Sequence, residues 1–232
     1  MRIGFLSTNA HKFEETQAIL AELYPEATVV QVVPDEDVEE TGETFEANAL
    51  IKLEAGLAML AEQKNDFDYL LAEDAGLVVD ALDGTYGISP FPGVQSNRWL
   101  TLERQVELLG SQEFETRYGA VNAALLRLLS RTHSEAELND SEAILDRSAR
   151  YVSVMAAWSA QGNQVNTVRG QLELTVGRNA QGTEGFGYDP IMHLRHHELS
   201  AQSIGELPAS LKNSISHRRQ ALSEWVSHHH NF

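Results

Sequence analysis

Apolar and polar residues follow one another in short blocks whose spacing switches between that of strands and that of helices. The apolar run 2–6 predicts a short strand, and Asn9 then stands where a helix cap is expected. Across 13–24 the apolar residues recur at roughly helical spacing, and Pro25 ends that run. The β-branched segment 28–33 predicts a second strand. The chain therefore begins as strand, helix and strand.

The rest of the pattern continues this alternation. Thr44 is a candidate N-cap for a second helix, whose apolar stripe runs from Phe45 to Leu60. Further strands are expected at 69–72, 77–79, 151–158, 165–169 and 172–176, with the last pair joined across Gly170. Further helices are expected at 101–110, 116–130 and from about Ser216. Interleaved strands and helices predict an α/β fold with a mixed sheet. The region 111–148 is expected to be a partly flexible insertion in a single domain that spans 1–232.

Charge and cysteine content exclude several classes of protein. The 232 residues include 17 Lys and Arg against 34 Asp and Glu, and 17 − 34 gives a net charge of −17. Such a chain lacks the basic surface that polymeric nucleic acid requires, although a few local cations could still bind a small anion. There is no cysteine, which excludes disulfides, thiolate zinc sites and cysteine nucleophiles and agrees with a reducing cytoplasm.

Targeting and membrane signals are not expected either. The first apolar run is too short for the core of a signal peptide. No stretch approaches the roughly 20 apolar residues that a membrane span needs. We therefore expect a soluble, cytoplasmic protein.

The segment from Ser7 to Lys12 lies where a strand leads into a helix. Backbone N–H groups at a helix N-terminus, with a lysine in the first turn, favour phosphate oxygens. The alternative is that Asn9 only caps the helix and Lys12 is solvated.

In the second helix, Lys52 lies only about 20° and Asn48 about 60° from Phe45 around the axis, so both flank the buried stripe. Either Lys52 faces a ligand, or its stem is buried while its ammonium reaches water.

Two acidic pairs, Glu39-Glu40 and Glu73-Asp74, are each closed by a glycine two residues later. The second pair sits between apolar segments, where a carboxylate is costly unless it is paired or bound to a metal. A divalent cation such as Mg²⁺ would let several carboxylates converge on one point beside substrate phosphates. The alternative for each pair is a turn with solvated acids.

Two further segments carry candidate binding residues. The loop 185–190 places an aromatic residue, Phe186, between glycines, where it could stack on a base; the alternative is a plain turn. Lys212 and the group 216–219 form a basic cluster before the last helix, which could bind an anionic ligand. The alternative is that these residues only cap the helix and add to solubility. The histidines at 196–197 and 228–230 lack zinc-site spacing and are interpreted as surface residues.

Taken in order, these segments resemble the inosine triphosphate pyrophosphatase family, which hydrolyses non-standard purine nucleoside triphosphates. The resemblance is carried by 7–12, 39–52, 72–98, 185–190 and 212–218. It implies an elongated mixed β-sheet with flanking helices that form two lobes around a central cleft, and a homodimer. It also implies hydrolysis of ITP, dITP or XTP to the monophosphate and pyrophosphate, with Mg²⁺ as cofactor.

The same resemblance implies roles for individual residues. Asp74 would be the general base, and the metal ligands would be Glu40, Glu73 and Asp74. The substrate-binding residues would be Ser7, Thr8, Asn9, Lys12, Asn48, Lys52, Ala75, Phe186, Gly187, Tyr188, Asp189, Lys212, His217 and Arg218. Within this set, Phe186 would stack on the purine. An Arg218 donor aimed at a 6-oxo oxygen would find no acceptor in adenine's amino group.

The sequence departs from the family pattern at several positions. Ala75 stands where many relatives carry a hydroxyl residue, and Glu73 replaces the more usual aspartate. The loop 84–93 is longer than usual, and Gln95 stands where an aromatic residue is common. Two alternatives stay open: a non-catalytic nucleotide-binding or sensor protein, and a pyrophosphatase of modified pyrimidine nucleotides.

Overall fold

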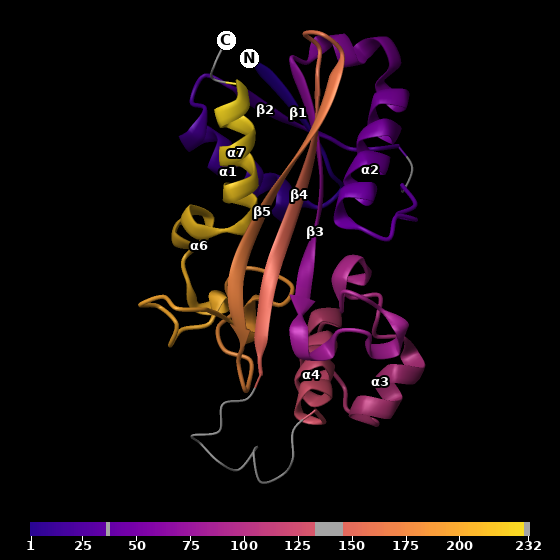
Figure 1. Cartoon of the computed structure of the whole chain (residues 1–232), viewed down its shortest axis with the longest axis vertical. Helices are drawn as coiled ribbons and strands as arrows, with labels where there is room; N and C mark the ends of the chain where they lie inside the picture. The colour runs from indigo at the N-terminus through magenta and orange to yellow at the C-terminus, as the bar shows by residue number, and fades with distance from the viewer. Residues whose placement is uncertain (36–37, 133–145, 230–232) are drawn as a thin grey trace. The chain divides into compact units, whose positions relative to one another are not determined.

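The computed structural model describes the whole chain except residues 36–37, 133–145 and 230–232, and its strands form one six-stranded sheet (Figure 1). The strand order is β2-β1-β3-β4-β5-β6. β1 pairs in parallel with both β2 and β3, whereas β5 and β6 are antiparallel. The sheet is therefore mixed, and the predicted α/β class is confirmed.

The elements agree closely with the alternation read from the sequence. The strands are β1 (Arg2–Leu6), β2 (Thr28–Val32), β3 (Tyr69–Val79), β4 (Ser148–Ser159), β5 (Gln164–Val176) and β6 (Met192–Leu194). The helices are α1 (Ala10–Leu23), α2 (Phe45–Leu60), α3 (Leu102–Leu109), α4 (Arg117–Ser130), α6 (Ala209–Ile215) and α7 (His217–His229). Both expected caps are present: Asn9 accepts from the Lys12 N–H at 3.2 Å, and Thr44 accepts from the Ala47 N–H at 3.1 Å.

The chain divides into two compact units. The first comprises Met1–Gly76, Val152–Leu172 and Asn213–Phe232, and the second comprises Leu77–Tyr151 and Glu173–Lys212. β3, β4 and β5 contribute residues to both units.

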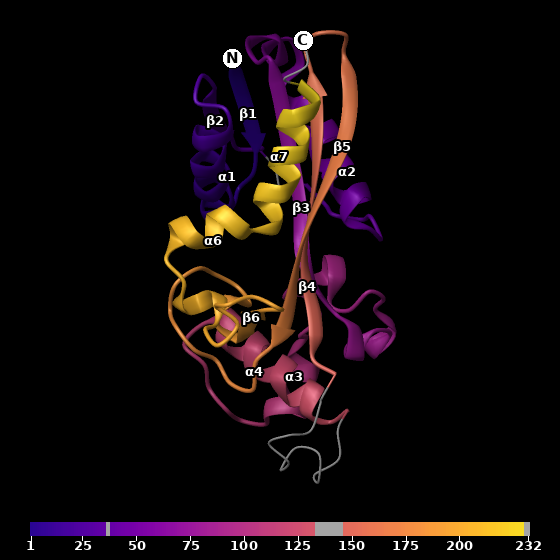
Figure 2. The same cartoon turned by 60° about the vertical axis from the view of Figure 1, so that its left-hand side comes forward.

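The core of the first unit is built between β1 and the helix pair α1 and α7. Ile3 and Phe5 alternate along β1 onto one face, where they join Ile19 of α1 and Trp225 of α7, all four of them almost fully buried. Figure 2 shows α7 beside α1. Gly170 of β5 permits this packing, since a Cβ there would lie 1.9 Å from the backbone oxygen of His217 at the start of α7.

The second unit has its own core around two helices and an aromatic cluster. α3 packs against α4, which contributes the buried Leu125 and Leu129. Phe91 meets Trp99 edge to face, with ring centroids 5.1 Å apart, and both side chains are buried.

One expectation requires correction. The two strands predicted at 69–72 and 77–79 are one strand, β3, because its acidic residues are paired and stay inside the sheet. The segments 165–169 and 172–176, expected to join across Gly170, are the continuous strand β5. The helix expected at 116–130 is α4, and residues 133–145 of the predicted insertion 111–148 lie outside the described part of the chain. Within the described residues, the helices are too short or too polar to cross a lipid bilayer.

Candidate active site

β3 carries the two acidic residues at the centre of the site, and their side chains lie on opposite faces of the sheet. Glu73 and Asp74 are 3% and 5% exposed, and consecutive strand residues point to opposite faces. In the first unit, α2 lies on one side of the sheet and α1 and α7 lie on the other (Figure 1). Asp74 contacts α2, whereas Glu73 contacts α1 and α7.

Asp74 lies in a cluster formed with residues of α2 and the segment before it. Lys52 donates to Oδ1 of Asp74 at 2.7 Å, and Asn48 Nδ2 donates to Oδ2 at 3.3 Å. The same Lys52 ammonium lies 2.6 Å from Oε1 of Glu40. Asn48 also accepts from the Gly42 N–H at 2.8 Å, which ties the segment of Glu40 to the helix. Lys52 and Asn48 thus face the site, as their position beside the buried stripe allowed.

Burial and neighbouring charges act against each other on Asp74. Burial raises the pKa of its carboxyl group, the attraction of Lys52 and Lys12 lowers it, and the net pKa is raised from the ordinary value. Burial lowers the pKa of Lys52, but Asp74 and Glu40 raise it by more. Lys52 is thus held as a cation against two carboxylates.

Glu73 belongs to a different cluster, which is an ion-pair network with α7. Arg218 donates from Nε and Nη2 to the two Glu73 oxygens, each at 2.9 Å, and the Ser153 hydroxyl donates to Oε1 at 2.6 Å. Lys12 Nζ lies 3.4 Å from Oε2, and Arg218 also pairs with Glu15. Burial raises the pKa of Glu73, but Arg218 and Lys12 outweigh it and hold that pKa well below its ordinary value.

The three carboxylates expected to share one metal ion do not converge. Among the residues that the structure describes, no three histidine or carboxylate side chains come together in a group that could hold a metal. The physical reason is the alternation along β3, which directs Glu73 to Arg218 and away from Asp74. Glu40 and Asp74 remain together, since Lys52 contacts both.

The segment between β1 and α1 is a turn that ends in the Asn9 cap of α1. The Ser7 hydroxyl accepts from the Asn9 N–H at 3.1 Å, and Asn9 caps α1. Thr8 is exposed at the tip, and Lys12 in the first helical turn reaches Glu73. Ser7, Thr8, Asn9 and Lys12 therefore lie at the N-terminus of a 14-residue helix in the first unit, where the helix dipole favours anions.

In the second unit, the loop 185–190 is organised around the buried carboxylate of Asp189. Tyr151 donates its hydroxyl to Oδ1 at 2.9 Å, while Lys212 Nζ and the Phe186 N–H donate to Oδ2 at 2.8 and 2.9 Å. The Lys212 ammonium lies 4.4 Å from the centroid of the Phe186 ring. Gly185 has φ +74°, and a Cβ there would lie 2.2 Å from Asp189 Oδ2, so this turn requires glycine.

Gly187 and Tyr188 form hydrogen bonds with residues outside the loop 185–190. The Gly187 carbonyl accepts from Asn122 Nδ2 at 3.1 Å. The Tyr188 hydroxyl accepts from Trp99 Nε1 at 3.0 Å and donates to the Ser96 carbonyl at 2.7 Å. Tyr188 is 5% exposed, so its side chain anchors the loop to the interior of the second unit.

The remaining predicted residues fall into these clusters by unit. Lys212 of α6 belongs to the second unit with Asp189, whereas His217 and Arg218 open α7 in the first unit and are buried. Ala75 follows Asp74 in β3 and is partly exposed. His228 is exposed on α7, and residue 230 lies outside the described residues.

Sequence reasoning missed three residues that hold the candidate side chains in place. Glu15 lies one turn after Lys12 in α1 and pairs with Arg218, a spacing that could have suggested it. Ser153 was visible as a lone polar residue in an apolar strand. Tyr151 gave no signal, since an aromatic residue at a strand position fits the core equally well.

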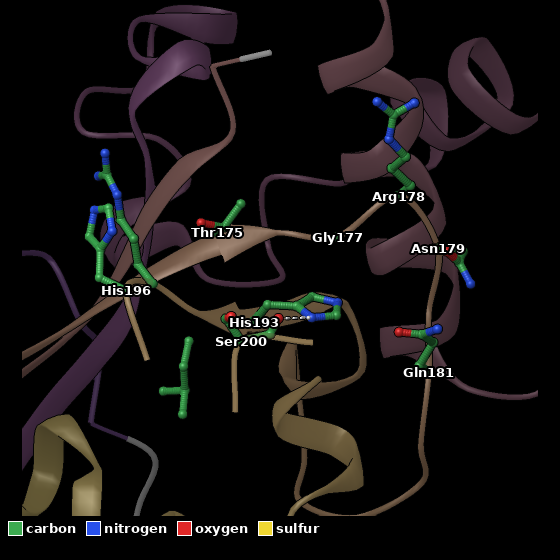
Figure 3. Close-up of a pocket in the computed structure, with 10 residues that line it drawn as sticks. Thr175, Gly177, Arg178, Asn179, Gln181, His193, His196 and Ser200 are labelled. Atoms are coloured by element: carbon green, nitrogen blue, oxygen red, sulfur yellow. Dashed lines mark hydrogen bonds between the residues drawn. The ribbon is translucent and has the colours of Figure 1, made fainter. Parts of the chain in front are cut away.

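A separate opening of about 530 Å³ lies beside the end of β5 and β6 in the second unit (Figure 3). Its basic residues are Arg178, His193, Arg195 and His196, and the described residues that line it include no acid. Figure 3 places Arg178 and His196 on opposite sides of Thr175, so these groups do not converge on one point. None of the predicted site residues lines it, and we assign it no ligand.

The chain matches known proteins over almost its full length. The model of the Ham1 family matches residues 3–228. A dITP/XTP pyrophosphatase of Symbiobacterium thermophilum is 36% identical over 223 residues, which are 96% of this chain and 91% of that protein. A dITP/XTP pyrophosphatase of Leuconostoc mesenteroides is 34% identical over 227 residues, covering 97% and 94% of the two chains.

Solved structures agree with this match. A HAM1 protein from Coxiella burnetii aligns over the full length of both chains, with a TM-score of 0.71 and 27% identity. A nucleoside-triphosphatase described as a dITP/XTP pyrophosphatase, from Mycobacterium abscessus, aligns over 97% of each chain with a TM-score of 0.61 and 30% identity.

Proposed function

The chain belongs to the Ham1 family, and from that premise we propose that it hydrolyses non-standard purine nucleoside triphosphates, such as dITP, ITP and XTP, to the monophosphate and pyrophosphate. The relatives named dITP/XTP pyrophosphatase match it over nearly the whole of both chains. The observation in this chain that carries the proposal is the buried Asp74 carboxylate held by Lys52 and Asn48. The protein is accordingly a hydrolase acting on acid anhydrides.

Asp74 is the group that we assign as general base. Its raised pKa makes it a stronger base than an ordinary carboxylate, and the attraction of the Lys52 ammonium favours its ionised form. In the reaction, the oxygen of a water forms a bond to the α-phosphorus, and its proton passes to Asp74. The bond from that phosphorus to the bridging oxygen breaks, and pyrophosphate leaves.

Glu40 and Asp74 are the residues that would hold Mg²⁺. Their oxygens approach the Lys52 ammonium to 2.6 and 2.7 Å, so the chain presents two carboxylates to a single cation position. Mg²⁺ is usually held by one or two carboxylates together with substrate phosphates, and this donor set fits that preference. When bound, Mg²⁺ neutralises charge on the phosphates. We leave Glu73 out of this set because Arg218 engages both of its oxygens.

The phosphates are assigned to the first unit. The turn from Ser7 to Asn9 offers hydroxyls and backbone N–H groups at the start of α1. Lys12 and Lys52 add two positive charges beside Asp74, and both lower its pKa through their attraction. Such charges offset the negative charge that develops on the phosphates during transfer.

The purine is assigned to Phe186 and Lys212 of the second unit. An aromatic ring stacks on a base with a stabilisation of about 1–3 kcal/mol, which is available to any base. Selectivity then requires donors for the 6-oxo oxygen that hypoxanthine and xanthine carry and adenine lacks. A site built to donate to that oxygen rejects adenine far more strongly than shape alone would.

The test is a comparison of four substrates with the pure protein at millimolar Mg²⁺. We expect pyrophosphate release from ITP and XTP to exceed release from GTP and ATP. Equal release from all four would overturn the specificity. Tight binding without turnover over hours would favour the sensor alternative, for which Ala75 is the motivating residue. Selective hydrolysis of modified pyrimidine triphosphates would favour the other alternative, a pyrophosphatase of modified pyrimidine nucleotides.

Two further expectations accompany this proposal. The family resemblance supports a homodimer, and the substrate supports a cytoplasmic location, where the nucleotide pool is found. Light scattering after gel filtration tests the first, since a mass of one 25.7 kDa chain would contradict it. Fractionation of cells that make the protein tests the second.

A further inference from the structure

We propose that Tyr151 is a positioning residue for purine recognition, acting through Asp189. Both side chains belong to the second unit and are buried, at 7% and 2% exposure. The Tyr151 hydroxyl donates to Asp189 Oδ1 at 2.9 Å. The inference rests on the proposed function, because it concerns the loop to which we assign the purine.

The carboxylate of Asp189 is the point at which this loop is held together. Oδ2 accepts from Lys212 Nζ at 2.8 Å and from the Phe186 N–H at 2.9 Å. These two contacts come from α6 and from the loop itself, which places the Lys212 ammonium 4.4 Å from the Phe186 ring centroid. The relative position of the stacking ring and the cation is therefore set by the orientation of one carboxylate.

Tyr151 fixes that orientation from a rigid element. It lies in β4, between sheet neighbours β3 and β5, whereas the other donors lie on a loop and a short helix. A buried carboxylate oxygen that loses its donor turns toward another donor or admits water. Loss of the Tyr151 hydroxyl would therefore rotate Asp189 and loosen its hold on Phe186 and Lys212. Burial and the Asp189 charge raise the pKa of Tyr151 well above its ordinary value, so it stays a donor.

The first test is the kinetic effect of Tyr151→Phe, which removes one hydroxyl and keeps the ring. We expect KM for ITP to rise about tenfold while kcat changes by less than about threefold, because the phosphate site is untouched. Tyr86→Phe is the matched control, since it also removes a tyrosine hydroxyl that contacts a carboxylate, that of Glu107. An unchanged KM in Tyr151→Phe would overturn the proposal, and so would an equal rise in both variants.

The second test asks whether Tyr151 acts through Asp189. In an Asp189→Asn background, adding Tyr151→Phe should raise KM by less than about twofold, since the group that it orients has lost its charge. Fully additive effects would mean that Tyr151 supports the loop by packing alone.

A third measurement does not depend on turnover. Lys212 is buried against Asp189, so its reaction with acetic anhydride, followed by mass spectrometry, should be slow, with Lys64 as internal reference. Tyr151→Phe should increase the labelling of Lys212 severalfold, and Tyr86→Phe should not. Unchanged labelling would contradict the positioning role even if the wild-type protein proved active. Increased labelling in a protein inactive on ITP would instead count against the proposed function alone.

Discussion

Glu73 and Asp74 are consecutive residues of β3, yet their carboxylates face opposite sides of the sheet and have opposite pKa shifts. Glu73 pairs with both arms of the Arg218 guanidinium, and its pKa is lowered despite burial. Asp74 contacts Lys52 and Asn48, and its pKa is raised. Neighbouring titratable groups with divergent pKa values mark a division of roles. Glu73 anchors α7, and Asp74 is the carboxylate to which we assign proton transfer.

Asp74→Asn should abolish most turnover without unfolding the protein. The amide cannot take a proton, and loss of a general base costs about 100- to 10,000-fold in rate. The change is nearly isosteric, and Lys52 keeps Glu40 as a partner, so the thermal midpoint should move by only a few degrees. Pyrophosphate release and thermal unfolding measure the two effects.

Asp66→Asn serves as the control for that variant. It makes the same chemical change at an exposed position of the same unit. Its kcat should equal that of the wild type. A near wild-type rate in Asp74→Asn would remove Asp74 from the role of base.

The dependence of turnover on Mg²⁺ should distinguish Glu40, which we assign to the metal, from its neighbour Glu39. Chelation with EDTA should stop turnover, and added Mg²⁺ should restore it. In Glu40→Gln one of the two converging carboxylates is lost, so the Mg²⁺ concentration for half-maximal rate should rise about tenfold or more. Glu39→Gln, at an exposed position, should behave like the wild type. Activity that survives EDTA would contradict a metal requirement.

Acid should weaken the fold partly through Glu73. Its pKa is lowered in the folded protein, so its stabilisation is fully present above the ordinary value of 4.5 and is lost as pH falls below it. Glu73→Gln removes the negative charge that balances the buried Arg218 guanidinium. It should lower the free energy of unfolding by about 3 kcal/mol at pH 7. The difference in unfolding free energy between wild type and variant, measured in urea, should shrink from pH 6 to pH 3. A constant difference would show that the ion pair contributes nothing.

Much of the fold was predictable because its signals are local. The caps Asn9 and Thr44 and the apolar stripe from Phe45 to Leu60 specify α1 and α2 without tertiary information, and both helices begin where predicted to within a few residues. The interruption expected at residues 73–76 was wrong for a nonlocal reason. Charged residues break a strand only when nothing pairs with them, and the partners of Glu73 and Asp74 lie in α7 and α2, far along the chain.

The candidate site was predictable in its residue types and less so in its geometry. The position of Lys52 and Asn48 beside the buried stripe correctly indicated that they point inward. The convergence of Glu40, Glu73 and Asp74 was wrong, although strand alternation alone would have separated the last two. Tyr151 could not be found, because its role depends on a hydrogen bond to a residue 38 positions away.

The buried tyrosines of the second unit should resist ionisation. Burial raises the pKa of Tyr151 and of Tyr188 well above the ordinary value, so both should stay protonated in the folded protein as pH rises past about 10. A folded-state pKa above the unfolded value of about 10 gives stability that is complete below pH 10 and is lost as pH rises further. Absorbance at about 295 nm should therefore rise in two stages, the second coinciding with unfolding followed by circular dichroism. Tyr151→Phe should reduce the amplitude of the second stage, and a single stage that reports all six tyrosines of the folded protein would contradict their burial.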